Sequence, residues 1–285
     1  MRRNPIYVRC HGGLGNQLFS FAMGVTLARK FSRGLILDLS ALSAQSRAQH
    51  DYPNLLEWNL DVLTMNLPFF RIVRDRNTKF ASRKIFLSKV SAKLNLKSNF
   101  PSITDAINKY ELHPSIKYLT GHYENIFFTN LGVDVQDFRN LGLLEPSESF
   151  DYLSTQSKMV NPIGIHVRLG DYKTWFDGEY LLSKNYYQNA LNLIPSNFKT
   201  RECWLFSDDP DEASKLLDFI PNLRIISGRF DLTVSEELLL LSRCSLLVIS
   251  QSTLSWWAGF LANNQTSIIS PKNGREMPGW LTLPT

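Results

Sequence analysis

Four short groups of polar residues could do chemistry, and each follows an apolar run typical of a buried strand. The first, residues 12–17, is a glycine turn before a one-sided apolar helical pattern, and its backbone N–H groups could bind an anion. It lacks the Lys-Ser/Thr pair of a P-loop, and Leu18 replaces the third glycine of a dinucleotide fingerprint. The glycines, Gly13 among them, fit a tight turn equally well, whereas the amides of Asn16 and Gln17 favour contact with a ligand.

The second group lies at residues 166–172 and contains His166, Arg168 and Asp171. His166 and Arg168 are two residues apart on a predicted strand and therefore project from the same face. A guanidinium there suits a diphosphate, because its planar fork pairs with two oxygens and does not lose its proton. A structural ion pair between Arg168 and Asp171 is the alternative, and both can hold, because a carboxylate often orients an arginine.

The third group, Ser207, Asp208 and Asp209, also follows an apolar strand pattern. Paired carboxylates can hold Mg²⁺. Asp209 before Pro210 can equally cap a helix, and a carboxylate can accept hydrogen bonds from the N–H edge of a guanine. These residues alone leave the three uses open.

The fourth group places the hydroxyls of Ser252, Thr253 and Ser255 at the predicted start of a helix. A helix N-terminus with hydroxyls is again a place for an anion. The alternative is a pair of capping serines in front of two core tryptophans, Trp256 and Trp257.

The pattern around these groups predicts strands that alternate with helices. Such a chain forms parallel sheets with helices on both faces, and ligands bind beyond the carboxyl ends of the strands. Pro146 and Ser147, and then Asn161 and Pro162, indicate a linker near residues 145–160. We therefore expect an α/β protein of two doubly wound domains, residues 1–155 and 156–285. The predicted strands are residues 6–10, 35–38, 118–119, 163–168, 203–206, 223–226, 246–250 and 267–270, and the clearest helices are residues 185–194, 236–242 and 256–261.

Composition excludes several classes of protein. The chain has 285 residues, of which 44% are hydrophobic and 20% charged, as in globular proteins and unlike disordered or coiled-coil chains. Cys10, Cys203 and Cys244 lie far apart, so neither a disulfide framework nor a structural zinc site is expected. No apolar run approaches the roughly 20 residues that span a bilayer, and no signal peptide is recognisable. The expected compartment is the cytoplasm.

Basic residues concentrate in one segment. Residues 71–97 hold nine Lys or Arg and one acidic residue, although the whole chain carries a net charge of only +5. From Lys79 on, apolar and basic positions recur at helical spacing, which predicts an amphipathic basic helix. A solvated face over ordinary core packing is the alternative. We expect an anionic membrane surface as the partner of this segment, and no nucleic acid, because most aromatic residues fall at core spacing.

Taken together, the polar groups resemble the motifs of the bacterial α-1,2-fucosyltransferases, glycosyltransferase family 11. They occur in the family's order and span about residues 10–262. Two positions depart from the family pattern, because Leu169 stands where a second arginine is usual and Gln251 where asparagine is usual. The matching blocks are residues 12–19, 166–172, 206–209 and 252–257, with a weaker fifth block at 121–128.

The resemblance implies a GT-B fold of two facing Rossmann-like domains, with the acceptor on the N-terminal domain and GDP-L-fucose on the C-terminal one. It implies inversion at the transferred sugar without a metal or other cofactor. His166, Arg168 and Asp171 would form the catalytic group beside the diphosphate. The residues implied to bind the nucleotide are Gly13, Asn16, Gln17, His166, Arg168, Ser207, Asp208, Asp209, Ser252, Thr253 and Ser255.

The expected reaction is transfer of L-fucose from GDP-L-fucose to a galactose hydroxyl of a surface polysaccharide or oligosaccharide. A base must take the proton of the acceptor hydroxyl, and Asp38, Glu124 and Asp177 are candidates that the sequence does not separate. A lipid-linked acceptor would place the enzyme peripherally on the inner face of the membrane. The alternatives are transfer from another nucleotide sugar, a non-catalytic glycan- or nucleotide-binding module, and a dinucleotide oxidoreductase.

Overall fold

The structure, a computed structural model, describes residues 5–39, 42, 63–64, 70–71, 118–119, 138, 141–272 and 275–285. The chain divides into two compact units. Unit 1 comprises Met1–Trp58 and Asn66–Asp137, and unit 2 comprises Asn59–Met65 and Phe138–Thr285. Glu124 and all of the basic segment except Arg71 lie outside the described residues.

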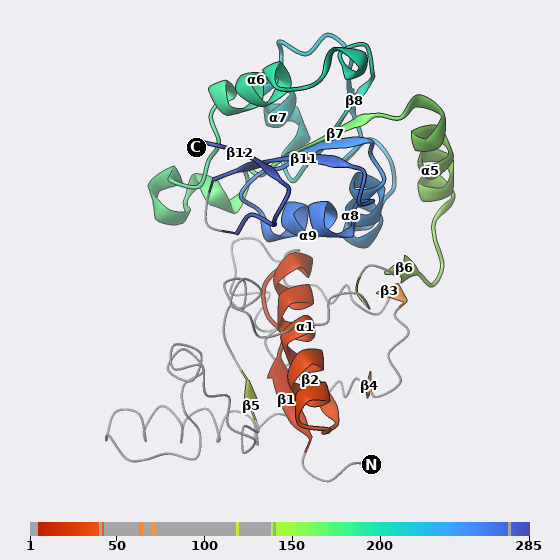
Figure 1. The fold of residues 1–285 in the computed structure, drawn as a ribbon, viewed down its shortest axis with the longest axis vertical. Coiled ribbons are helices and arrows are strands. Elements are labelled where there is room, and N and C mark those ends of the chain that lie inside the picture. Colours follow the sequence, from red (N-terminus) through yellow and green to blue (C-terminus); the bar gives the residue numbers. More distant parts are fainter. Residues whose placement is uncertain are drawn as a thin grey trace. The chain divides into compact units, whose positions relative to one another are not determined.

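Unit 1 contains a sheet of four parallel strands in the order β4-β2-β1-β5. Helix α1 (Leu14–Lys30) connects β1 to β2, and Figure 1 shows it beside these two strands. Gly24 lets the helix approach them, because a Cβ at this position would lie 2.8 Å from Cγ2 of Val8 and 2.7 Å from Cδ1 of Leu35. The strands are β1 (Ile6–Arg9), β2 (Leu35–Asp38), β4 (Phe70–Arg71) and β5 (Tyr118–Leu119).

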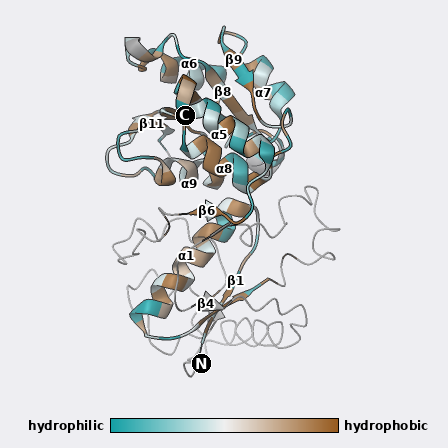
Figure 2. Cartoon of the chain, turned by 90° about the vertical axis from the view of Figure 1, so that its right-hand side faces the viewer, coloured by the Kyte–Doolittle hydropathy of each residue, from teal (hydrophilic) through white to brown (hydrophobic). Residues whose placement is uncertain are grey.

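The sequence pattern predicts a helix with one apolar face. Helix α1 is instead buried on all sides, so this part of the prediction is wrong. Every residue from Leu14 to Ala28 is buried except Asn16, and Figure 2 shows hydrophobic colour on successive turns. Gln17 and Thr26, which are polar and buried within this stretch, donate hydrogen bonds to nearby backbone carbonyls. The Thr26 hydroxyl, for example, donates to the Ala22 carbonyl at 2.8 Å.

Unit 2 contains a sheet of six parallel strands in the order β12-β11-β10-β7-β8-β9. When the six strands are numbered along the chain and read from β9 to β12, the order is 3-2-1-4-5-6, which is typical of doubly wound nucleotide-binding sheets. In Figure 1, α6 and α7 lie on one face of the sheet and α8 and α9 on the other. The strands are β7 (Ile163–Val167), β8 (Cys203–Ser207), β9 (Leu223–Ile225), β10 (Leu246–Val248), β11 (Ser267–Pro271) and β12 (Leu281–Leu283), and the helices are α6 (Lys184–Asn192), α7 (Pro210–Leu216), α8 (Val234–Ser242) and α9 (Thr253–Leu261).

The linker predicted near residues 145–160 is wrong, because a helix, α5 (Glu148–Val160), occupies it. Ser147 is the N-cap, and its hydroxyl accepts a hydrogen bond from the Phe150 N–H at 3.1 Å. The same Ser147 donates its own N–H to Glu236, which also closes the capping box of α8. Pro146 and Ser147 therefore mark a helix start. The expected boundary between residues 155 and 156 falls inside α5, and the donor and acceptor roles of the two domains stay predictions.

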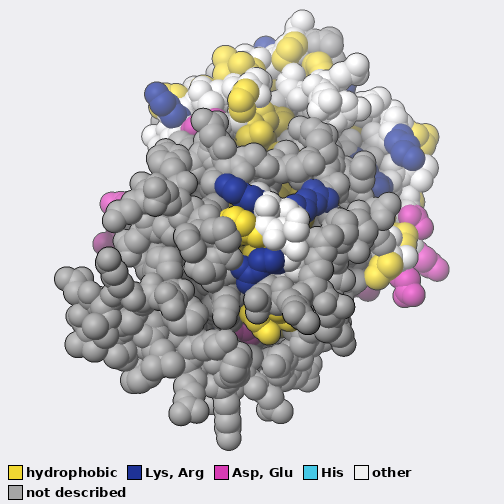
Figure 3. Space-filling model, turned by 60° about the horizontal axis from the view of Figure 1, so that its bottom comes forward, with side chains coloured by type: hydrophobic (Ala, Val, Ile, Leu, Met, Phe, Trp, Pro, Cys, Tyr) yellow, Lys and Arg dark blue, Asp and Glu magenta, His cyan; other side chains and the backbone are white. Residues whose placement is uncertain are grey.

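Two smaller features of the described chain lie in unit 2. A short antiparallel pair joins β3 (Leu63–Thr64) to β6 (Gly142–Leu143) within unit 2. Helix α5 exposes Tyr152 and Met159. Figure 3 shows hydrophobic side chains beside acidic and basic ones at its right edge. In the part of the chain that the structure describes, no helix has both the length and the apolar character needed to cross a membrane.

Candidate functional site

Three of the four polar groups meet at one edge of the unit 2 sheet. Strands β7 and β10 are neighbours, and from this pair the chain winds outward in opposite directions. Ligands of doubly wound sheets bind in the crevice that forms at such a switch point, beyond the carboxyl ends of the strands. Residues 168–171 follow β7, residues 208–209 follow β8 and residues 249–252 follow β10.

Two carboxylates hold the guanidinium of Arg168. Its Nε donates to Asp171 Oδ1 at 3.0 Å and its Nη2 lies 2.8 Å from the same oxygen, while Nη1 lies 3.2 Å from Asp208 Oδ2. The Tyr172 ring lies 5.6 Å from the guanidinium carbon. The predicted pair of Arg168 and Asp171 is therefore present, and Arg168 has one fixed direction.

The two adjacent aspartates have different partners. Asp208 accepts the Leu169 N–H at 2.9 Å and faces Arg168; burial raises its pKa, although the charge of Arg168 opposes the rise. Asp209 is the N-cap of α7 and accepts a hydrogen bond from Lys173 at 2.7 Å, which lowers its pKa. The capping alternative is thus confirmed for Asp209.

His166 belongs to a buried network with serines that follow β10. Its Nδ1 lies 2.8 Å from the Ser250 hydroxyl, which lies 3.3 Å from the Ser255 hydroxyl. Burial, reinforced by the charge of Arg168, lowers the pKa of His166 to about 3, so the ring is neutral at physiological pH. Ser255 is fully buried and donates to the carbonyls of Ser250 and Ser252. The network joins the ends of β7 and β10.

Two consecutive tyrosines of α6 support the same junction from the sheet face. The Tyr187 hydroxyl donates to the His166 carbonyl at 3.3 Å, and the Tyr186 hydroxyl donates to the Ile249 carbonyl at 2.7 Å. Both rings are buried, and burial raises the pKa of each phenol. The tyrosines remain neutral donors and fix the backbone at the switch point.

The turn at residues 250–252 leads into α9. Ser252 is the N-cap, and its hydroxyl accepts the Leu254 N–H at 3.2 Å. Thr253 is the first residue of the helix, whereas Trp256 and Trp257 are core residues. The alternative of a capping serine before core tryptophans is therefore confirmed for Ser252, Trp256 and Trp257, whereas anion binding at this helix N-terminus stays a prediction.

The first polar group lies in unit 1, directly after β1. Gly12 has a φ of +69°, and a Cβ there would lie 2.6 Å from Asn16 Nδ2, so only glycine fits. Gln17 is fully buried and donates to the Gly12 carbonyl at 2.9 Å. Gly13 is the N-cap of α1 without a side-chain cap. Within the described chain, Asn16 Oδ1 is buried and has no hydrogen-bond partner, which is typical of an atom that awaits a ligand or water.

The three base candidates lie in different parts of the chain. Asp38 ends β2 in unit 1 and is buried. Asp177 is exposed in unit 2, in a 3₁₀ helix (Trp175–Gly178), with a φ of +52°. Glu124 lies outside the described residues. Among the residues that are described, no three His, Cys, Asp or Glu side chains group as a metal site would require.

Sequence reasoning missed two residues near the sheet edge. Burial raises the pKa of Glu237 on α8 to about 7, with a smaller contribution from Asp208, against a hydrogen bond from Ser227. The Ser227 hydroxyl also accepts the Ser207 N–H at 3.0 Å. Arg275 follows β11 and donates through Nη2 to the Gln251 carbonyl at 2.6 Å. No local pattern marks either residue, because both reach the site only through the fold.

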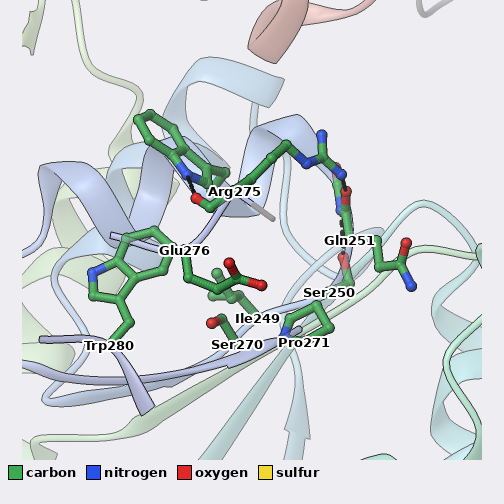
Figure 4. Close-up of a pocket in the computed structure, with 10 residues that line it drawn as sticks. Ile249, Ser250, Gln251, Ser270, Pro271, Arg275, Glu276 and Trp280 are labelled. Atoms are coloured by element: carbon green, nitrogen blue, oxygen red, sulfur yellow. Dashed lines mark hydrogen bonds between the residues drawn. The ribbon is translucent and has the colours of Figure 1, made fainter. Parts of the chain in front are cut away.

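A shallow open pocket lies between the 250–252 turn and Arg275. It has about 210 Å³ of empty space, part of which is open to solvent. In Figure 4 the Arg275 guanidinium lies on the Gln251 side, while the Glu276 carboxylate lies near Ile249 and Ser270 and points away from Trp280. The pocket therefore has a cation near Gln251 and a carboxylate near Ser270.

Comparison with known proteins places these features in a class. The crystal structure of fucosyltransferase NodZ from Bradyrhizobium aligns with a TM-score of 0.56 at 14% identity, over 92% of this chain and 94% of NodZ. A NodZ α-1,6-fucosyltransferase structure soaked with GDP-fucose gives 0.51 at 15% identity, over 91% and 92% of the two chains. At such identities the likeness concerns the fold. Together with the two parallel sheets, it confirms the predicted α/β, GT-B-like fold class.

Residues 5–278 match the sequence pattern of glycosyl transferase family 11, and the chain belongs to this family. The O-antigen biosynthesis glycosyltransferase WbnK of Escherichia coli is 25% identical over 308 residues, which cover 98% of this chain and 100% of WbnK. An α-1,2-colitosyltransferase of Escherichia coli is 23% identical, over 92% of this chain and 89% of that protein. The family resemblance of the motifs is confirmed, and the protein is a glycosyltransferase.

Proposed function

We propose that the protein transfers L-fucose from GDP-L-fucose, with inversion, to a galactose hydroxyl in a polysaccharide or oligosaccharide of the cell surface. The observation that carries the proposal is Arg168, fixed by Asp171 and Asp208 at the switch point of the unit 2 sheet. The family membership, the relative named for O-antigen biosynthesis and the fold shared with fucosyltransferases support it.

The chemistry requires stabilisation of the leaving group. As the bond between the fucose anomeric carbon and the β-phosphate oxygen breaks, the electron pair goes to GDP and negative charge grows there. Donors that already point at this position lower the barrier without reorganisation. Arg168 and the N-terminus of α9, with Ser252 and Thr253, can supply such donors. Neutral His166 would hold the Ser250 side of the turn in place.

The acceptor hydroxyl attacks the anomeric carbon and loses its proton to a base. Asp38, at the carboxyl end of β2, is the candidate whose position suits the acceptor domain. The resemblance assigns Asn16 to the nucleotide, but its Oδ1, which lacks a partner in the described chain, can equally accept a hydrogen bond from a sugar hydroxyl, and we propose this second role. Unit 1 would then recognise the neutral acceptor, in keeping with its uncharged loop.

The deciding experiment incubates purified protein with GDP-fucose and a panel of galactose-ended acceptors, followed by mass spectrometry and linkage analysis of the product. We expect one added deoxyhexose on the 2-hydroxyl of galactose. Product with GDP-fucose but at another hydroxyl would overturn the linkage, and no product with any acceptor, together with no donor hydrolysis, would overturn the transferase reaction.

A second donor is favoured by one specific observation, the relative named as an α-1,2-colitosyltransferase. Colitose differs from fucose by the loss of one hydroxyl, so both sugars fit the same chemistry. GDP-colitose belongs in the donor panel, and a higher kcat/KM with it than with GDP-fucose would replace fucose by colitose in the proposal.

Metal independence is part of the proposal, because Asp208 is engaged by Arg168 and Asp209 caps α7. Excess EDTA should leave turnover unchanged. Loss of turnover on chelation, with recovery on adding Mg²⁺, would return the aspartate pair to a metal site.

Attachment to a lipid-linked acceptor at an anionic membrane is also proposed, from the charge of residues 71–97 alone. Each engaged Lys or Arg contributes about 1 kcal/mol at such a surface. Sedimentation with anionic liposomes should weaken with salt and when Arg83, Lys84, Lys89 and Lys93 become Gln. Equal sedimentation of both proteins would remove the membrane from the proposal.

A further inference from the structure

We propose that Arg275 is a second guanidinium of the donor site, which binds the β-phosphate from the β11 side of the 250–252 turn. The inference rests on the proposed function, because it assigns a residue to the diphosphate of the same donor. Arg275 lies outside every motif block of the sequence, and its placement comes from the fold alone.

The charge balance around Arg168 calls for another cation. Asp171 and Asp208 both contact this guanidinium, so the three groups together carry a net negative charge when the carboxylates are ionised. A diphosphate approaching this cluster meets repulsion as well as attraction. One arginine with two carboxylate partners is therefore a weak anion site by itself.

Arg275 is the cation that the sheet order brings to the opposite side of the turn. Strand β10 lies between β7 and β11, and all three strands are parallel. Arg168 follows β7, the 250–252 turn follows β10, and Arg275 follows β11. The two guanidinium groups therefore flank the turn from which α9 starts, where the open N–H groups of the helix would bind a phosphate.

Arg275 is held in position through both its backbone and its guanidinium. The Trp256 indole Nε1 donates to the Arg275 carbonyl at 2.7 Å, and Arg275 Nη2 donates to the Gln251 carbonyl at 2.6 Å. A guanidinium carries five N–H donors, and the bond to Gln251 uses one of them. Because the guanidinium is already oriented, little entropy would be lost on contact with a phosphate.

The pocket beside the turn agrees with a phosphate at its Gln251 end. Figure 4 shows the guanidinium of Arg275 at this end and the carboxylate of Glu276 apart from it, near Ser270. A carboxylate repels phosphate but accepts hydrogen bonds from hydroxyl groups. The arrangement therefore orients the donor, with phosphate near Arg275 and away from Glu276.

The test compares the affinities of GDP and GMP, measured by titration calorimetry, for the full-length wild type and for Arg275→Gln and Arg275→Lys. If Arg275 binds the β-phosphate, the Gln variant should lose about tenfold or more in GDP affinity, since hydrogen bonds to charged groups are the strong ones. Its GMP affinity should change less than twofold. The Lys variant keeps the charge without the fork and should lie between wild type and Gln.

A matched control comes from the amino edge of the same sheet. Arg201 donates through Nη1 to the Ser245 hydroxyl and to the Asn161 carbonyl, far from the carboxyl ends of the strands. Arg201→Gln therefore removes a comparable set of hydrogen bonds and should leave both affinities unchanged. Glu276→Gln removes the opposing charge and should tighten GDP binding by a few fold.

Each outcome decides the assignment. Equal loss of GDP and GMP affinity in Arg275→Gln, or no loss of either, overturns it even if wild type binds GDP and transfers fucose. If wild type binds a different nucleoside diphosphate instead of GDP, the proposed donor fails, and the same comparison with that diphosphate and its monophosphate tests Arg275. If wild type binds no nucleoside diphosphate, both proposals fall.

Discussion

The polar edge of unit 2 and the glycine loop of unit 1 are built from different materials. At the unit 2 edge, side-chain charges dominate, with Arg168 between Asp171 and Asp208. In the unit 1 loop, backbone geometry at Gly12 and the amides of Asn16 and Gln17 take that place, and no charged side chain belongs to the 12–17 sequence. From this contrast we predict a charged ligand at the unit 2 edge and an uncharged one at the unit 1 loop.

The largest effect should come from Arg168→Lys, the sharpest test of the charged half of this comparison. Lysine keeps the charge but cannot contact Asp171, Asp208 and a phosphate with one planar group. We expect turnover to fall about 100-fold or more, as when a preorganised donor is lost at a developing anion. Steady-state kinetics on protein whose circular dichroism matches wild type checks this, and near-normal turnover would remove Arg168 from the leaving group.

Asn16→Ala tests the uncharged half. The buried Oδ1 of Asn16 has no partner in the described chain, so its removal should not lower the melting temperature, while kcat/KM for the acceptor should fall about tenfold through loss of one hydrogen bond. Gln17→Ala is the contrasting variant, because it breaks the bond to the Gly12 carbonyl and should lower stability. A fall in stability for Asn16→Ala would make Asn16 structural.

His166→Asn separates positioning from proton transfer at the charged edge. Because burial and Arg168 lower the pKa of His166 to about 3, its protonation should not shape the wild-type rate between pH 5 and 8. The Asn variant can keep the bond to Ser250 and should lose only a few fold in turnover with an unchanged pH profile. An acidic limb near pH 6.5 that disappears in the variant would show that His166 titrates during turnover.

Glu237→Gln should have the smallest effect, on stability rather than rate. Its pKa is raised from 4.5 to about 7, so the folded state holds a proton that the unfolded state releases, and wild-type stability falls as pH rises through this window. In the wild type the free energy of unfolding should fall by up to about 3 kcal/mol over this window. The Gln variant should not show this fall. Urea unfolding at pH 5 and pH 8 measures it, with the exposed Glu212→Gln as control. If the unfolding free energies of wild type and Glu237→Gln differed by the same amount at both pH values, the raised pKa of Glu237 would be contradicted.

The sequence predicts the strands of unit 2 well because their apolar, β-branched runs end at polar turns. It extends two of these strands too far. The first is predicted to end at Arg168 but ends one residue earlier, at Val167, and the second is predicted to end at Ser250 but ends two residues earlier, at Val248. It misses α5, since Pro146 and Ser147 signal a loop and a helix start alike. These errors concern the ends of two strands and one helix. The contacts between strands matter more for the site, and the sequence pattern does not show them.

The contacts that make the site depend on strand order, which no local pattern contains. Arg168 and Asp208 are 40 residues apart in sequence, and they meet because β8 pairs with β7. His166 and Ser250 meet because β10 pairs with β7 on the other side. The sequence identified these side chains as polar strand ends, and the sheet decides which of them touch.

The winding of the unit 2 sheet has a consequence for biosynthesis. Strands β7, β8 and β9 can pair once residue 225 has left the ribosome, but the partner on the other side of β7 begins only at residue 246. Until then the inner edge of β7 presents unpaired N–H and C=O groups to any neighbouring chain. Long-range parallel pairing is slow to form. The step that joins His166 to Ser250 is therefore also the step that covers this exposed strand edge of the nascent chain.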